Sequence, residues 1–143
     1  YVKTDMYDVC QDWYVWYIYA LICMMYWYVW YMSALICMLG HIFPVWLKFN
    51  GGKGIAVYVG VLFSFSIYLG LIFVSSWIIV FYLSKYSSLS SLASTLAIFL
   101  YSLTLDNFDI SIFCFIIFII VVYTHRENIS RIRNKTENKI NIL

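Results

Sequence analysis

Long apolar runs without charge limit what this chain can fold into more than any other feature. Residues 13–39, 55–83, 86–105 and 110–123 contain no Asp, Glu, Lys or Arg. A helix needs about 20 mostly apolar residues to cross the hydrocarbon of a bilayer. Only 11% of the chain is charged, against roughly 25% in an ordinary soluble domain. We therefore predict an all-α, polytopic membrane bundle with short or tilted helices, forming one transmembrane domain over residues 1–143.

The positions of the charges predict how the spans are oriented. Lysines flank the spans and basic residues crowd the tail, and positive charge beside spans favours the cytoplasmic side. Because Lys53 and Lys85 lie at the two ends of the run 55–83, a single crossing would put one of them on the wrong side. Two short or tilted helices, turning near residues 64–66, remove that conflict. Asp106 and Asp109 predict a short outward-facing loop before the last span.

The first 39 residues form an atypical segment. Residues 13–26 (WYVWYIYALICMMY) recur almost unchanged as residues 27–40 (WYVWYMSALICMLG). A repeat of 14 residues is two heptads, which is consistent with an aromatic helix that reuses one face. The alternative is a duplication or an altered reading frame in front of an otherwise ordinary membrane protein. The two interpretations remain open at this point.

Three polar clusters separate the apolar runs, at residues 40–54, 85–91 and 125–137. Because ionisable groups are costly inside hydrocarbon, we expect all three to share one cytoplasmic layer and to form one site. In the first cluster, Gly51-Gly52-Lys53-Gly54 resembles an anion cradle, since glycines let backbone N–H groups converge and lysine adds charge. A flexible interfacial turn would also explain it.

The second and third clusters each carry polar groups at helical spacing. Ser88 and Ser91 lie three residues apart at a predicted helix start, where hydroxyls either cap the helix or meet an anion. His125, Asn128 and Arg131 would lie on one stripe if the helix continued from the last span. A basic tail that binds anionic lipid explains the arginines and lysines, but it does not require His125 and Asn128.

Taken together, the clusters resemble the bacterial acyl-phosphate:glycerol-3-phosphate acyltransferases of the PlsY type, over about residues 40–140. The family patterns GHxFPxFLxFKGGKGVA, RYxSLAS and RHRENIxRLxxGTE match GHIFPVWLKFNGGKGIA, KYSSLSS and THRENISRIRNKTE here. The family's earlier pattern, GSGNxGATNxxR, has no counterpart in this sequence. The chain is therefore expected to be a truncated or frame-damaged copy, whose activity alone is open.

The resemblance implies transfer of a fatty acyl group from acyl phosphate to the 1-hydroxyl of glycerol 3-phosphate, giving lysophosphatidic acid. It implies phosphate binding by a first set of residues, a catalytic pocket from a second set, and a structural role for Glu127. The first set is Gly51, Gly52, Lys53, Gly54, Ser88 and His41, and the second is His125, Asn128 and Ser91. The expected partners are these substrates and membrane lipids, with no nucleic acid, at a bacterial inner membrane.

Other function classes fit the sequence less well. The four cysteines, Cys10, Cys23, Cys37 and Cys114, show no CxxC spacing, so neither a metal site nor a disulfide framework is indicated. No cofactor is expected. The sequence lacks both the GxSxG serine elbow and the HxxxxD pattern of acyl-CoA-dependent acyltransferases. A noncatalytic membrane remnant or partner subunit is the first alternative, and a small transporter, for which no inverted repeat is visible, is the second.

Overall fold

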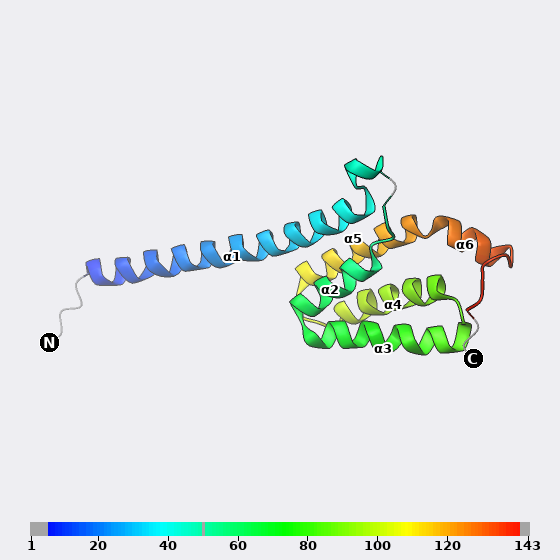
Figure 1. Ribbon diagram of the computed structural model, residues 1–143. Helices are drawn as coiled ribbons and strands as arrows, with labels where there is room; N and C mark the ends of the chain where they lie inside the picture. Colours follow the sequence, from blue (N-terminus) through cyan, green and yellow to red (C-terminus); the bar gives the residue numbers. More distant parts are fainter. Residues whose placement is uncertain (1–5, 50, 141–143) are drawn as a thin grey trace. The chain divides into compact units, whose positions relative to one another are not determined.

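A computed structural model describes residues 6–49 and 51–140, and these form helices, turns and extended segments with no strand among them (Figure 1). The chain divides into two compact units, residues 1–34 and residues 35–143. The all-α architecture agrees with the prediction. The predicted border of the atypical segment, between residues 39 and 40, falls inside helix α1 (Met6–Ile42).

The aromatic repeat lies in helix α1. At 3.6 residues per turn, 14 residues make about 3.9 turns, so the second copy returns almost to the face of the first. Between residues 15 and 30, every side chain that the structure describes is exposed, and Tyr26 contacts Trp30 with ring centroids 6.2 Å apart. The helical interpretation of the repeat therefore agrees with the structure.

The uncharged run 55–83 folds as two helices, α2 (Ile55–Phe65) and α3 (Ile67–Ser84). They meet at Ser66, whose backbone is extended and whose hydroxyl accepts a hydrogen bond from the N–H of Tyr68. The predicted turn near residues 64–66 is thus confirmed. At 1.5 Å per residue, α2 is about 16 Å long and α3 about 27 Å.

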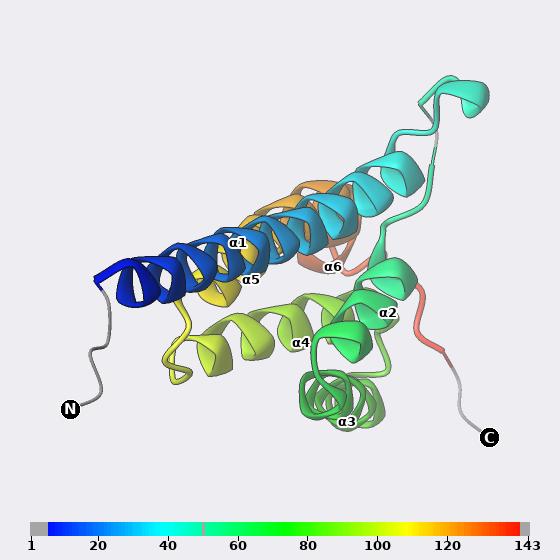
Figure 2. The ribbon, with the colours of Figure 1, turned by 90° about the vertical axis from the view of Figure 1, so that its left-hand side faces the viewer.

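Helix α4 (Ser87–Ser102) packs against both α3 and α5 (Phe108–Thr124), although hydroxyls line much of its surface. Ser90, Ser94 and Thr95 are completely buried, and each hydroxyl donates to the carbonyl four residues earlier. These bonds satisfy the hydroxyls inside the helix, and the small side chains let neighbouring helices approach closely. Figure 2, which looks nearly along α3, shows α4 crossing it.

The last span does not continue as one straight helix, so the condition for placing His125, Asn128 and Arg131 on one stripe is not met. Helix α5 ends at Thr124, and α6 (Arg126–Arg133) leaves it at an angle of 59°. His125 lies at the bend and is buried, because its imidazole turns back along α5 to the carbonyl of Val121. At the other end of α5, Asn107 accepts a hydrogen bond from the N–H of Ile110 and so caps the helix after a short turn.

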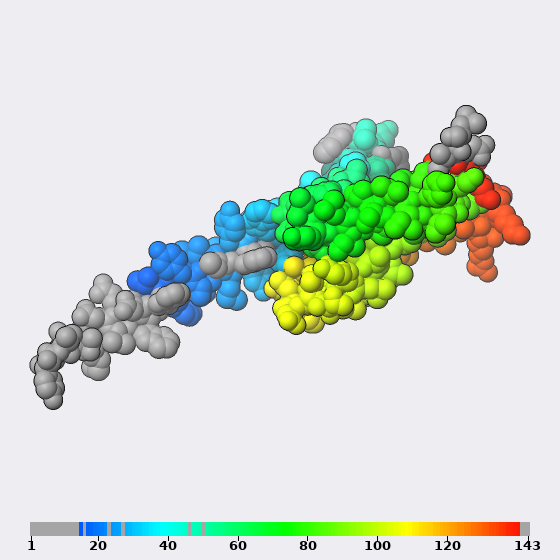
Figure 3. Space-filling view, turned by 90° about the horizontal axis from the view of Figure 1, so that it is seen from below, coloured from blue at the N-terminus to red at the C-terminus, as the bar shows by residue number. Residues whose placement is uncertain are grey.

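Within the described residues, two helical segments, Tyr17–Ile42 and Ile67–Ser84, are long and apolar enough to cross a membrane, and there are up to three if the bent pair of α5 and α6 is one span. Helices α2 and α4 are apolar but shorter. Figure 3 shows the outer side of α3, in green, with the α4–α5 turn in yellow beside it. Apolar side chains such as Ile79, Tyr82 and Leu83 are exposed on α3, which suits a surface that faces lipid.

Candidate functional site

A cavity of about 650 Å³ lies within the unit of residues 35–143. Its wall combines residues from all three polar clusters of the sequence, together with side chains from α3 and from the segment after α6. The lining residues are His41, Lys53, Gly54, Ile55, Ala56, Trp77, Ser87, Ser88, Ser91, His125, Asn128, Glu137, Asn138 and Ile140. The structure therefore brings together the distant clusters that the sequence predicted would form one site.

The glycine loop is held tightly against the end of α1. A Cβ atom on Gly51 would lie 2.2 Å from the carbonyl oxygen of His41, and one on Gly52 would lie 2.3 Å from the Nε2 of the same residue. The N–H of Gly52 already donates to the His41 carbonyl at 3.2 Å. Neither glycine lines the cavity, so the phosphate contacts predicted for them stay a prediction. Gly51 instead allows a close approach of two backbones, and Gly52 leaves room for the imidazole of His41.

The next two residues of the loop do line the cavity. Gly54 has a positive φ of 81° and forms the N-cap of α2, a conformation that a side chain would strain. The carbonyl of Lys53 accepts a long hydrogen bond of 3.4 Å from the hydroxyl of Thr124, which ties the loop to the end of α5. Lys53 is exposed and carries a positive charge into the cavity wall.

Two helices begin at the cavity, and neither first turn has a side-chain cap. Helix α2 starts with Ile55 and Ala56, and α4 starts with Ser87 and Ser88. The first N–H groups of a helix have no partner inside it, and the helix dipole makes that end positive. The cavity wall thus combines two positive helix ends with the Lys53 ammonium. This arrangement favours an anion with several oxygen atoms.

His125 supplies a neutral nitrogen to the same cavity. Its Nδ1 lies 2.9 Å from the carbonyl oxygen of Val121, and a carbonyl can only accept, so Nδ1 carries the proton and Nε2 keeps its lone pair. Burial lowers the pKa of His125, and the nearby charge of Lys53 lowers it further, against the backbone hydrogen bond and Glu137, which raise it. A neutral imidazole at pH 7 is therefore positioned to accept a proton.

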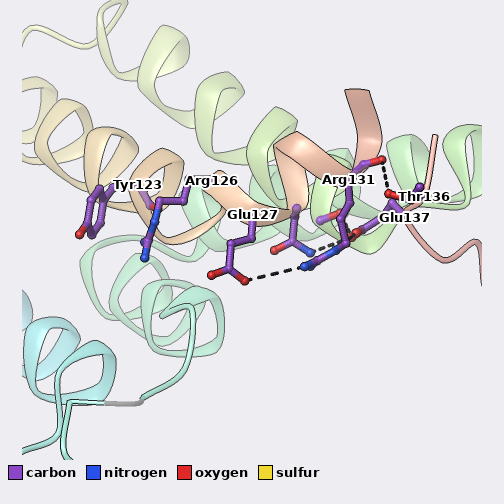
Figure 4. A network of polar contacts seen from close by, with 8 residues as sticks. Tyr123, Arg126, Glu127, Arg131, Thr136 and Glu137 are labelled. Carbon is purple, nitrogen blue, oxygen red and sulfur yellow. Dashed lines mark hydrogen bonds and ion pairs between the residues drawn. The ribbon is translucent and has the colours of Figure 1, made fainter. Parts of the chain in front are cut away.

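Glu137 organises the wall opposite the loop (Figure 4). Its Oε1 accepts from the amide of Asn128 and from the hydroxyl of Ser88, both at 2.7 Å. Its Oε2 accepts from Arg131 Nε at 2.7 Å. The hydrogen bonds from Asn128 and Arg131 lower the pKa of Glu137 to about 2. One carboxylate thus joins α4, α6 and the segment after α6.

Glu127 lies outside the cavity wall. Its side chain is 75% exposed and pairs with Arg131 at 3.8 Å, on the side of Arg131 away from Glu137 (Figure 4). An exposed pair of this kind contributes little to stability. The structural role predicted for Glu127 stays a prediction, and Glu137 makes the connecting contacts instead.

Sequence reasoning assigned no role to Glu137 or Trp77. A signal for Glu137 was present, because it ends the third family-like pattern as the Glu of its Thr-Glu pair. Trp77 had no such signal, since the sequence does not distinguish an aromatic residue that lines a cavity from one that faces lipid when both lie inside an apolar run. Asn138 and Ile140 join the wall because the Ile140 N–H donates to the carbonyl of Lys85 at 3.0 Å.

The chain matches the family model described as glycerol-3-phosphate acyltransferase over residues 6–135. Among curated relatives of that description, the protein of Pelagibacter ubique is 55% identical over 104 residues, which are 73% of this chain and 54% of the relative. The protein of Anaplasma marginale (strain Florida) is 46% identical over 102 residues, 71% of this chain and 52% of the relative. The chain therefore spans about half the length of these relatives.

The comparison with solved structures finds proteins of the same description. A crystal structure of PlsY (YgiH), described as an integral membrane glycerol 3-phosphate acyltransferase in its glycerol 3-phosphate form, superposes with a TM-score of 0.72 at 32% identity. The match covers 75% of this chain and 54% of that one. The lysophosphatidic acid form of the same protein matches equally well. The chain is accordingly an all-α integral membrane protein.

Proposed function

Because the chain belongs to the glycerol-3-phosphate acyltransferase family, we propose that it takes part in the transfer of a fatty acyl group from acyl phosphate to glycerol 3-phosphate. The products are lysophosphatidic acid and inorganic phosphate. The matched PlsY structures, which are described as glycerol 3-phosphate and lysophosphatidic acid forms, support this choice of substrate and product.

One observation carries the proposal: the ends of two uncapped helices and the Lys53 ammonium meet at a cavity that also holds His125. The phosphate of glycerol 3-phosphate has the negative charge and the several acceptor oxygens that these groups favour. The same charges stabilise the phosphate that leaves the acyl donor. Electrostatic stabilisation of developing charge is a large part of catalysis in such sites.

The chemical step needs no covalent enzyme intermediate, because an acyl phosphate is already activated. The 1-hydroxyl oxygen of glycerol 3-phosphate attacks the acyl carbon and forms the ester bond. The bond between that carbon and the bridging oxygen breaks, and inorganic phosphate takes the electron pair. Two groups can accept the hydroxyl proton: the phosphate dianion of glycerol 3-phosphate itself, and His125 Nε2, which keeps its lone pair because Nδ1–H donates to Val121.

We further propose that the cavity faces the cytoplasm at a bacterial inner membrane. We also propose that four residues of its wall take part in substrate binding or catalysis, namely Ser88, Ser91, Asn128 and His41. Lys85, Arg131 and Arg133 lie near the ends of helices on the side of the cavity, which the positive-inside rule supports. The apolar lipid-facing surface of α3 would let the acyl donor enter from the bilayer.

A phosphate-release assay tests the proposed function. The purified chain in lipid vesicles is supplied with palmitoyl phosphate, with and without glycerol 3-phosphate, and both phosphate and lysophosphatidic acid are measured. The expected result is equal amounts of the two products, formed only when glycerol 3-phosphate is present. Phosphate release that does not depend on glycerol 3-phosphate would overturn the proposal, and so would the absence of product both from the chain alone and from the chain supplied with the family's GSGNxGATNxxR segment.

A further inference from the structure

Helix α6 has one face toward the cavity and another away from it. It leaves α5 at 59°, and Asn128 on its inner face is buried at the cavity wall. At about 100° per residue, Arg126 and Arg133 lie within about 20° of each other on the helix, and Asn128 lies about 160° from Arg126. The two arginines therefore share the outer face of α6. That face consists of Arg126, Ile129, Ser130 and Arg133, all of which are exposed.

Both carboxylates close to α6 pair with a single cation that lies outside this face. Arg131 contacts Glu127 at 3.8 Å and Glu137 at 2.7 Å. Among the described residues, no ion pair involves Arg126 or Arg133. The outer face of α6 thus carries two positive charges without a counterion in the described part of the chain. They lie about 10 Å apart along the helix axis, because Arg133 follows Arg126 by seven residues at 1.5 Å each.

The side chain of Arg126 is held at the end of α5 (Figure 4). Its guanidinium carbon lies 4.6 Å from the centre of the Tyr123 ring, and its Nη1 donates to the Tyr123 carbonyl at 3.1 Å. Tyr123 is exposed in the last turn of an apolar helix, and tyrosines at the ends of spans lie at the level of the lipid headgroups. A guanidinium has five N–H donors, so Arg126 keeps donors for another acceptor at that level.

We infer that the outer face of α6 binds the headgroups of anionic phospholipids at the membrane surface. A guanidinium fork matches the two free oxygens of a phosphate diester. Ile129, exposed beside the two arginines, adds an apolar contact for the part of the lipid below the headgroup. A lipid fits better than an acidic protein, because Tyr123 fixes Arg126 at the end of a span. The inference concerns binding alone and does not depend on the proposed function.

The test measures how strongly single lipids bind the purified chain in detergent. Native mass spectrometry gives dissociation constants for phosphatidylglycerol and phosphatidylcholine with the same acyl chains, and the measured quantity is their ratio. One basic residue near an anionic surface corresponds to about a fivefold gain in affinity. The wild type should therefore prefer phosphatidylglycerol about 25-fold, and Arg126→Gln/Arg133→Gln should reduce this preference to about twofold or less.

Ser130 offers a second variant that keeps both arginines. It follows Arg126 by four residues and precedes Arg133 by three, so the carboxylate of Ser130→Glu would pair with an arginine on the helix surface. The preference should then fall to about fivefold or less. Ser130→Gln has the same size without the charge and should keep the wild-type preference. Lys48→Gln/Lys139→Gln removes two exposed charges elsewhere and should keep it as well.

The pattern of ratios decides between a site on α6 and a general attraction by charge. A preference that survives Ser130→Gln and the lysine pair, but falls in Ser130→Glu and in the arginine pair, supports the inference. An equal loss in the arginine and lysine pairs overturns it, because the lipid would then respond to the net charge of the chain. Equal binding of both lipids by the wild type also overturns it and leaves the outer face of α6 to an acidic protein. The acyltransferase proposal stands in either case, because no turnover is measured.

Discussion

The aromatic repeat of α1 and the serine-rich helix α4 differ in a way that reverses the usual rule for soluble proteins. The repeat is the more apolar of the two, yet its described side chains between residues 15 and 30 are all exposed. Helix α4 carries hydroxyls, yet Ser90, Ser94 and Thr95 are completely buried. In a bilayer, lipid is as apolar as the side chains, so apolarity alone does not select the core.

What selects the core is the ability to pack closely with every polar group satisfied. The buried hydroxyls of α4 donate within their own helix, so they add no unpaired group to the interior. Their small size lets α3 and α5 approach, and the first turn of α4 opens onto the cavity. Of the four comparisons below, given in order of expected effect, the isoleucine pair tests this difference directly and the other three test the cavity and the contacts that hold it.

The largest effect should come from removing the charge in the cavity. Lys53→Gln should lower kcat about 100-fold or more, because losing one group that stabilises developing charge typically costs 10²–10³ in rate. Lys48→Gln is the control, since Lys48 belongs to the same loop region but does not line the cavity. The measurement is phosphate release that depends on glycerol 3-phosphate. An equal loss of activity in both variants would mean that the rate depends on the net charge of the protein and not on a charge placed at the cavity.

Matched isoleucines compare the two regions directly. Ile98 in α4 is completely buried, whereas Ile22 in the repeat is 54% exposed. Ile98→Ala should lower the free energy of unfolding by about 2 to 5 kcal/mol, because it leaves a hole between packed helices. Ile22→Ala should change it by less than about 0.5 kcal/mol. Thermal unfolding in one detergent measures both, and similar losses would contradict the contrast drawn above.

Glu137 makes stability depend on pH. Its pKa is lowered from 4.5 to about 2, which at about 1.4 kcal/mol per pKa unit corresponds to at most about 3 kcal/mol. A lowered pKa means that this stabilisation is complete above pH 4.5 and is lost as the pH falls towards 2. Glu137→Gln should therefore be less stable than the wild type at pH 7, with the difference shrinking below pH 4.5. Glu127→Gln, at an exposed position, is the control and should change the stability at pH 7 by less than about 0.5 kcal/mol.

The smallest effect concerns the glycine loop. Gly51→Ala should destabilise the protein by about 1 to 3 kcal/mol, since the new methyl group would meet the His41 carbonyl oxygen and the backbone must shift. Gly40→Ala is the control, because a Cβ there meets nothing within 4 Å. Replacing a glycine inside a helix should even stabilise it slightly. Unfolding temperatures that rank the two variants the other way would remove the close-approach explanation.

The sequence predicted the features of the fold that depend on local rules. Uncharged runs predicted the helices, and the lysines at both ends of the run 55–83 predicted the turn confirmed at Ser66. The unequal lengths of α2 and α3 follow from the position of that turn, which is nearer to Lys53 than to Lys85 in the sequence. The bend at His125 could not be predicted, because no glycine or proline lies at that position. It depends on the burial of one imidazole against Val121.

The sequence predicted the site residues that belong to a motif. It did not predict those that reach the site only through tertiary contacts. Lys53, Ser88, Ser91, His125 and Asn128 lie around the cavity as a group. Gly51 and Gly52 do not, because a glycine that holds an anion and one that admits a neighbouring backbone have the same sequence signal. The contacts of Glu137 span 9 residues to Asn128 and 49 to Ser88, and no local pattern encodes such distances.

Chemical labelling of lysines tests the central claim most directly, since it compares two residues in one sample. The wild-type chain is treated with an amine-reactive reagent, with and without glycerol 3-phosphate, and the modification of Lys53 and Lys48 is measured by mass spectrometry. A phosphate held at the cavity should protect Lys53 in a concentration-dependent way and leave Lys48 unchanged. Equal labelling of Lys53 with and without the ligand would contradict the account.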